Sequence, residues 1–233
     1  MSKKAILKLD EKEFEFPVIE GIESEKAVDF RKLRSRTGYV SYDEGYGNTG
    51  SCQSEITYVD GEQGILRYRG IPIEQLADSS DFLESSYMIL YGDLPTQAEL
   101  DQFHARIRNN AAVSPLMSRA LKGMPSDAPP MGVLGCLLSA MSCYNSELAT
   151  NDRARDVENF DQAAAAAISQ TATAAALSYR ISKGLEGNRP DSSLSFADNF
   201  LHLMLSEEGK PYEPVAEVSR ALDLMLLLHA DHE

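Results

Sequence analysis

The chain has 233 residues, of which 43% are hydrophobic and 25% are charged, a balance that is typical of an ordinary globular protein with one large domain or two modest ones. Its 22 basic and 36 acidic residues give a formal net charge of -14, which argues against a nucleic acid or a membrane as a partner, because both are bound through basic patches. No stretch reaches the roughly 18 uninterrupted apolar residues of a membrane span. The start, MSKKAILKLDEKE, has no apolar signal core, so we expect a cytoplasmic protein.

The N-terminal part of the chain is predicted to be rich in β-structure. Ala5, Leu7 and Leu9 alternate with polar residues, and Phe14 and Phe16 do the same after a polar DEK turn, which predicts a small hairpin. A second hairpin is predicted where the β-branched and aromatic runs SEITYV and ILRYR flank the turn residues DGEQG.

After the second hairpin the pattern changes to helices. Pro72 is placed to open one helix, and Ser80 is predicted to cap the helix DFLESSYMILYG, which Gly92 ends. Thr96 and Glu99 have the spacing of a capping box at the start of TQAELDQFHARIRNN. Successive helices with short connections predict a bundle-like α domain.

Two later helices, 131–144 and 161–184, are rich in Gly, Ala, Ser and Thr. Such small residues let helix backbones approach closely, and a surface helix would show more Lys and Glu. We therefore predict that both helices lie inside the fold or at a subunit interface; the alternative is a low-complexity helix without a special role. Cys52, Cys136 and Cys143 are predicted to be reduced, buried thiols.

The last two predicted helices are SFADNFLHLMLSE (195–207) and EPVAEVSRALDLMLLLHADHE. The second begins with Pro214 at a suitable first position. Because this helix is apolar on all sides near its end, we predict that it is buried.

The glycines of GYGNTG (45–50) have the spacing of a phosphate-binding loop, G-x-G-x-x-G. A dinucleotide site needs a helix directly after the loop, whereas SCQSEITYVDG predicts a strand. The kinase version needs a Val two residues beyond the last glycine, where this chain has Cys52. We therefore predict a plain surface loop.

The end of the chain, with His229, Asp231, His232 and Glu233, is its strongest chemical feature. One interpretation is that the imidazoles bond the free carbonyls of a helix C-terminus. A zinc site is the second, although HADHE lacks the HExxH spacing and the two other histidines would have to be brought in by folding. The third is an anion site, in which imidazole donors bind a substrate that carries carboxylates.

Two segments at opposite ends of the chain resemble the citrate synthase family. TGSCQSEITYVDGEQGILRYRGIPIEQLA (49–77) closely resembles the N-terminal signature of citrate synthases of the Gram-negative bacterial type, and LHADHE (228–233) resembles a second family segment. YGDLPT, PYEP and the order of the helices are also similar, so the resemblance covers essentially the whole chain.

The resemblance implies a mainly α-helical fold. It would consist of a β-rich N-terminal region with hairpins (1–69) and an incomplete large helical domain (70–233) that is truncated before the small domain. The implied activity is the condensation of acetyl-CoA with oxaloacetate and water to citrate and CoA, the first step of the tricarboxylic acid cycle. The family works as homodimers or as hexamers built from dimers, with acetyl-CoA as a substrate, and the resemblance implies no metal and no covalently bound cofactor.

The resemblance also assigns residues. His232 matches the family histidine that contacts oxaloacetate, and His229, Asp231 and Glu233 would support its orientation and tautomer. The chemistry needs a base, a donor at the developing oxyanion and a dry pocket. In the family the catalytic histidine of GPxHG, the catalytic aspartate and the substrate-binding arginines lie downstream of HADHE, so no catalytic residue is expected within 1–233. We therefore expect the front portion of a citrate synthase, inactive alone and prone to aggregate through exposed apolar surface.

Three further expectations concern specificity, regulation and class. Within the family, 2-methylcitrate synthase uses propionyl-CoA and is an alternative that no residue here decides. Many Gram-negative-type enzymes are inhibited by NADH at a basic site, but NNAA (109–112) and AAAAAISQ (163–170) contain no Arg or Lys, so we do not expect this inhibition. An alternative from another class is a non-catalytic helical dimerisation protein derived from the fold.

Overall fold

The computed structural model describes residues 3–114, 117, 119, 123–125, 127–146 and 150–231 of the chain. Its contacts divide the chain into two units, Met1–Glu55 and Ile56–Glu233. The fold is mainly helical with small antiparallel sheets, as predicted. The predicted β-rich region 1–69 thus comprises the first unit and the hairpin that opens the second, and its limit at residue 69 stays a prediction. None of the helices within the described residues has the length and apolarity that a membrane crossing requires.

The first unit is built on a three-stranded antiparallel sheet in the order β1-β2-β3, which confirms the first predicted hairpin. Phe16 is its main core residue, 1% exposed, and its ring meets the edge of Phe30 at 5.2 Å between centroids. The Arg36 guanidinium lies 5.0 Å from the Phe16 ring, within cation–π range. The elements are β1 (Lys4–Leu9), β2 (Lys12–Glu20), β3 (Lys26–Val28), α1 (Leu33–Thr37) and the 3-10 turn η1 (Glu44–Tyr46).

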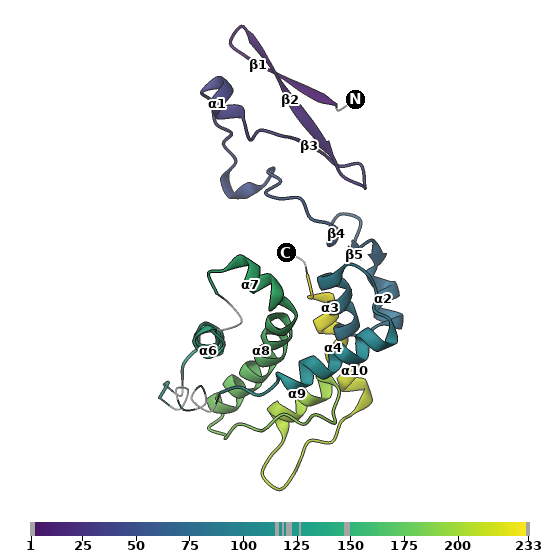
Figure 1. Cartoon of the computed structure of the whole chain (residues 1–233), viewed down its shortest axis with the longest axis vertical. Helices are drawn as coiled ribbons and strands as arrows, with labels where there is room; N and C mark the ends of the chain where they lie inside the picture. The colour runs from purple at the N-terminus through teal and green to yellow at the C-terminus, as the bar shows by residue number, and fades with distance from the viewer. Residues whose placement is uncertain are drawn as a thin grey trace. The chain divides into compact units, whose positions relative to one another are not determined.

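The second unit begins with strands and continues with helices (Figure 1). Thr57 pairs with Tyr68 and Asp60 with Ile65, which confirms the second predicted hairpin. The elements are β4 (Thr57–Asp60), β5 (Ile65–Tyr68), β6 (Ile71–Pro72), α2 (Ile73–Ser79), α3 (Phe82–Tyr91), α4 (Gln97–Asn109), α6 (Pro130–Tyr144), α7 (Arg153–Glu158), α8 (Phe160–Ser182), α9 (Phe196–Leu205) and α10 (Ala216–Leu228).

Helix α4 begins at the predicted capping box. The Thr96 amide donates to the Glu99 carboxylate at 2.8 Å, and the Glu99 amide donates to the Thr96 hydroxyl at 3.4 Å. Helix α3 ends at Gly92, as predicted, with φ of +105°. Both signals act within one helical turn, so the local sequence was sufficient to predict where α4 begins and where α3 ends.

Three predicted helix starts are wrong by one or two residues. Asp81 caps α3 in place of Ser80, and its carboxylate accepts the Glu84 amide at 2.8 Å. Pro72 is extended, with ψ of 140°, and precedes the first residue of α2. Helix α10 begins at Ala216 after an extended Val215, so Pro214 lies outside it. Adjacent residues compete for a cap position, and local packing decides between them.

Helix α8 lies at the centre of the second unit, which confirms that it is inside the fold. It contacts α4, α6, α7 and α9, and its small side chains permit this close packing on several sides. Its buried residues are Ala165, Ala166, Ser169, Gln170, Thr173, Ala174, Ala176, Leu177, Ser178 and Arg180.

Helix α6 is not enclosed by the described chain, so of its two predicted places, inside the fold or at a subunit interface, the described residues do not provide the first. Val133, Leu137 and Met141 pack against α8, while the opposite side is open. The prediction of buried thiols is wrong, since Cys136 and Cys143 share that open side and Cys52 is exposed as well. The exposed large apolar side chains of α6 are Met131, Leu138 and Tyr144. A place for α6 at a subunit interface stays a prediction.

Helix α10 is likewise covered on one side only. It packs on α2, α3 and α9, and Leu227 is its one fully buried side chain among the described residues. Val218 is 44% exposed and Met225 is 61% exposed. The prediction of a buried helix is therefore wrong for the described chain, because an apolar pattern does not itself supply a covering neighbour.

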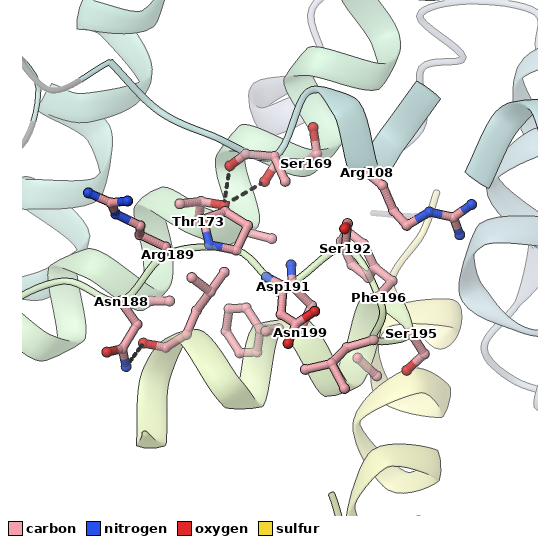
Figure 2. A pocket seen from close by; sticks show the side chains of 18 of the residues that line it. Arg108, Ser169, Thr173, Asn188, Arg189, Asp191, Ser192, Ser195, Phe196 and Asn199 are labelled. Carbon is pink, nitrogen blue, oxygen red and sulfur yellow. Dashed lines mark hydrogen bonds between the residues drawn. The ribbon is translucent and has the colours of Figure 1, made fainter. Parts of the chain in front are cut away.

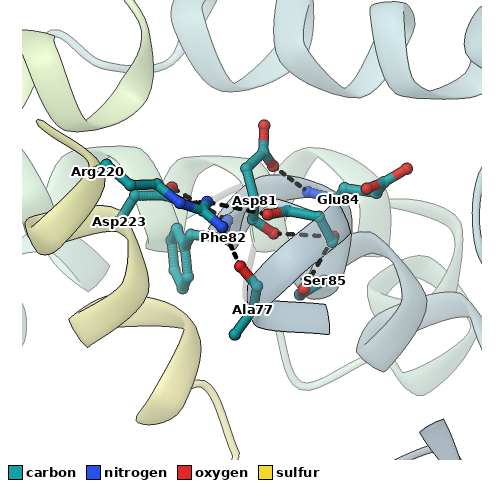
Figure 3. Close-up of polar contacts among 8 residues, drawn as sticks. Ala77, Asp81, Phe82, Glu84, Ser85, Arg220 and Asp223 are labelled. Carbon is teal, nitrogen blue, oxygen red and sulfur yellow. Dashed lines mark hydrogen bonds and ion pairs between the residues drawn. The ribbon is translucent and has the colours of Figure 1, made fainter. Parts of the chain in front are cut away.

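A polar cluster holds α10 against the junction of α2 and α3 (Figure 3). The Arg220 guanidinium donates to the Ser80 carbonyl at 3.0 Å, to the Ala77 carbonyl and to the Asp223 carboxylate at 3.0 Å. Asp223 also accepts the Phe82 amide at 3.1 Å. Burial raises the pKa of the Asp223 carboxyl, and the hydrogen bond from Phe82 opposes that rise. The cluster orients α10 and hence the segment that follows it.

Candidate functional site

The segment directly after α10 carries the described part of the predicted site. It is anchored by Leu227, which is 0% exposed and packs with Tyr68, and by a half-buried Ala230. The His229 ring is exposed, and its Nδ1 lies 2.7 Å from the Met225 carbonyl oxygen in the last turn of α10. Because a carbonyl oxygen only accepts, Nδ1 is the donor. His229 therefore makes the bond to a helix-terminal carbonyl that the first interpretation describes.

Two side chains of the β4–β5 hairpin hold Asp231. The Thr57 hydroxyl donates to the Asp231 carbonyl oxygen at 2.6 Å and to its carboxylate Oδ2 at 2.5 Å. The two oxygens share one hydroxyl proton. The Tyr68 hydroxyl donates to the Leu228 carbonyl at 3.2 Å and accepts the Asp231 amide at 3.4 Å. Burial raises the pKa of Tyr68, and the hydrogen bond from the Asp231 amide only partly opposes that rise, so the phenol stays protonated and able to donate.

The tertiary structure thus joins the two motifs that carry the family resemblance. Thr57 and Asp231 are 174 positions apart, and Tyr68 and Leu228 are 160 apart. Figure 1 shows the C-terminal end of α10 near the β4–β5 hairpin. Thr57 and Tyr68 carry no functional signal in the sequence, because both fit an ordinary strand and only their place within the longer motif distinguishes them.

The remaining predicted residues, His232 and Glu233, lie outside the described residues. The zinc interpretation gains no support from the rest of the site, because no group of three or more His, Cys, Asp or Glu within the described ranges could hold a metal ion. His202 is engaged in α9, where its ring nitrogens lie 2.8 Å from the Ser206 hydroxyl and 3.2 Å from the Arg189 carbonyl.

The glycine loop 45–50 is arranged around a carboxylate of its own unit. Asp43 accepts the Asn48 amide at 2.9 Å and the Thr49 hydroxyl. The hydroxyl bond is the largest cause that lowers the pKa of Asp43. No helix follows Gly50 directly, and the next element is the strand β4. The loop therefore lacks the helix terminus that phosphate binding requires, as predicted.

A separate pocket of about 1160 Å³ lies among α4, α8, α9 and the connection between α8 and α9 (Figure 2). Arg108 and Arg189 bring positive charge to it, and the buried Nε2 of His104 has no hydrogen-bond partner among the described residues. Several lining residues belong to the two stretches without Arg or Lys, namely Asn109, Ala111, Ala112 and Ser169. Because basic side chains reach the pocket from outside those stretches, the expected insensitivity to NADH stays a prediction.

The comparisons with known proteins agree on one family. The family model described as "Citrate synthase, C-terminal domain" matches residues 45–233. The chain is 38% identical over 229 residues to "Citrate synthase" of Dictyostelium discoideum, covering 95% of this chain and 44% of that protein. It is also 38% identical over 233 residues to "Citrate synthase" of Corynebacterium glutamicum, covering 100% of this chain and 52% of that protein.

Solved structures show the same similarity in the fold. The crystal structure of citrate synthase from Pyrobaculum aerophilum superposes with a TM-score of 0.73 at 30% identity, covering 93% of this chain and 50% of that chain. The chain spans about half the length of the curated relatives it matches. Since the family model covers most of the sequence, including the whole of both motifs, this chain belongs to the citrate synthase family.

Proposed function

We propose that the protein takes part in the condensation of acetyl-CoA with oxaloacetate to citrate and CoA. The observation that carries this proposal is the family match over 45–233, which includes the hydrogen-bonded hairpin and tail. Relatives named citrate synthase at 36–38% identity over at least 95% of the chain support it.

The proposed role of this chain is to supply part of the oxaloacetate site. His232 would donate a hydrogen bond to oxaloacetate, with His229, Asp231 and Glu233 as supports. What supports this is the hold on Asp231, the residue before His232, by the Thr57 hydroxyl. The base that removes the methyl proton and the donor to the enolate would come from residues other than 1–233, so we propose that 1–233 alone forms no citrate.

Replacing His232 with alanine in the intact protein tests this role. A hydrogen bond to a charged group contributes about 1.5–3 kcal/mol, so we expect the KM for oxaloacetate to rise at least about tenfold while the KM for acetyl-CoA changes little. Steady-state kinetics with release of the CoA thiol as the signal measures both. His104→Gln is the matched control, and its KM for oxaloacetate should stay within about twofold of the parent value.

The two possible failures differ. An intact protein that forms no citrate from acetyl-CoA and oxaloacetate contradicts the proposed reaction. An active protein whose KM for oxaloacetate is unchanged by His232→Ala contradicts only the role of His232.

We also propose the Gram-negative bacterial subtype, acting in the cytoplasm without a metal or a covalently bound cofactor. Two features support the subtype: the separate β-rich unit Met1–Glu55 and the amino-acid sequence of residues 49–77. A homodimer, or a hexamer built from three dimers, is proposed, with α6 at the dimer interface, because the described chain leaves one side of α6 uncovered. Light scattering of the intact protein tests this, and a monomer would contradict it.

A further inference from the structure

The β4–β5 hairpin lies within the longer family motif, although the proposed substrate contact lies at the other end of the chain. We propose that Thr57 and Tyr68 are positioning residues, which hold Leu228–Asp231 so that the residue after it, His232, meets oxaloacetate. This inference rests on the proposed function and gives the hairpin a part in the same site.

The two side chains form one platform. Thr57 and Tyr68 are paired directly across the antiparallel β4–β5 ladder, and directly paired residues project from the same face of a sheet. Their hydroxyls engage the Leu228 carbonyl, the Asp231 amide, and the Asp231 carbonyl and carboxylate. Backbone groups at both ends of the tail segment are therefore held by neighbouring side chains.

The platform itself is fixed to the core of the unit. Tyr68 is 0% exposed and packs with Leu76, Met88 and Leu227. The strand is followed by Arg69, whose φ of +49° is uncommon for a residue other than glycine. The Arg69 amide donates to the Ile56 carbonyl at 2.6 Å, and its guanidinium donates to the Ile89 carbonyl of α3 at 2.7 Å. These bonds tie the open end of the hairpin to α3, so a shift of the hairpin would require repacking.

The hold on Asp231 is the step that concerns the substrate. Its carbonyl leads directly into residue 232, and the Thr57 hydroxyl contacts that carbonyl and the half-buried carboxylate of the same residue. A misplacement of about 1 Å at a substrate-contacting group can cost on the order of a hundredfold in rate. Removing the hydroxyl while keeping the shape of the side chain should therefore impair oxaloacetate binding more than folding.

Kinetics of the intact protein with Thr57→Val test the inference. We expect the KM for oxaloacetate to rise about tenfold, with kcat and the KM for acetyl-CoA within about threefold of the parent. Thr57→Ser keeps the donor and should return the KM for oxaloacetate to within about twofold. Thr37→Val removes a comparable hydroxyl, which donates to the Leu33 carbonyl at 2.7 Å in the other unit, and should change none of these constants.

Tyr68→Phe provides an independent variant that keeps the buried ring. It should raise the KM for oxaloacetate severalfold and speed hydrogen exchange of the Asp231 amide, which donates to the Tyr68 hydroxyl. The inference is overturned if the parent forms citrate and Thr57→Val leaves its KM for oxaloacetate within twofold, or if Thr57→Ser is as impaired as Thr57→Val. If the unsubstituted protein forms no citrate, the proposed function is contradicted, and the inference that rests on it is contradicted as well.

Discussion

Replacing Leu227 with alanine is expected to lower the free energy of unfolding of the intact protein by about 2–5 kcal/mol, the range for a fully buried leucine. Leu227 is 0% exposed and packs in the cluster that contains Tyr68, Ile73, Leu76 and Met88. The loss combines the transfer free energy of the removed methyl groups with the cavity left beside a rigid tyrosine ring. Denaturant unfolding, with the midpoint and slope fitted together, measures it.

The neighbouring leucine provides a matched control. Leu228 is 39% exposed, and Leu228→Ala removes the same atoms, so we expect a loss below about 1 kcal/mol. Equal losses for the two variants would contradict the packing described for the end of α10. Because Leu227 anchors the segment that Thr57 and Tyr68 hold, Leu227→Ala should also raise the KM for oxaloacetate under conditions where the variant remains folded.

Replacing Arg180 with methionine is expected to lower the free energy of unfolding by about 2–5 kcal/mol, since the Met204 and Glu186 carbonyls would each lose a hydrogen bond from a charged donor, which contributes about 1.5–3 kcal/mol. Arg180 is 5% exposed, and its guanidinium donates to the Met204 carbonyl at 3.0 Å, to the Ser206 carbonyl at 2.6 Å and to the Glu186 carbonyl. Asn188 also donates to Ser206, at 2.9 Å, so that carbonyl keeps a partner.

The physical role of Arg180 is to satisfy the end of α9. The last carbonyls of a helix have no intrahelical donors, and a cation at that end also favours the helix dipole. Methionine fills much of the same volume, so the measured loss reports mainly the bonds and the charge. Arg153→Met, at an exposed position that begins α7, should change the free energy of unfolding by no more than about 0.5 kcal/mol. A loss below about 1 kcal/mol for Arg180→Met would contradict this role.

Short-range patterns predicted most of the elements. The alternation around Phe14 and Phe16 predicted the first hairpin, and the spacing of Thr96 and Glu99 predicted a capping box that the structure contains. The errors at Ser80 and Pro214 are shifts of one or two residues, the range within which helix ends are poorly defined by local signals.

Burial was predicted less well, for a different reason. The apolar character of α10 predicted that this helix is enclosed, whereas Met225 is 61% exposed. The small residues of α6 predicted a place inside the fold or at a subunit interface, and within the described chain Met131 of this helix is 75% exposed. Composition shows for which side chains exposure to water is unfavourable. Whether a neighbour covers those side chains depends on elements that are distant in the sequence.

The sequence by itself determined the mainly helical fold, the hairpins and the helix caps, because each depends on residues close together in the chain. It also determined the resemblance of two segments to one family, because that depends only on the residues of each motif. Only the tertiary structure decided that these segments meet, through Thr57 and Asp231 at 174 positions apart. It also decided that the His229 ring bonds the carbonyl of Met225. A hydrogen bond requires its donor and acceptor within about 3 Å of each other, and for Thr57 and Asp231 that proximity comes from the packing of α10 against α2 and α3 rather than from any local pattern.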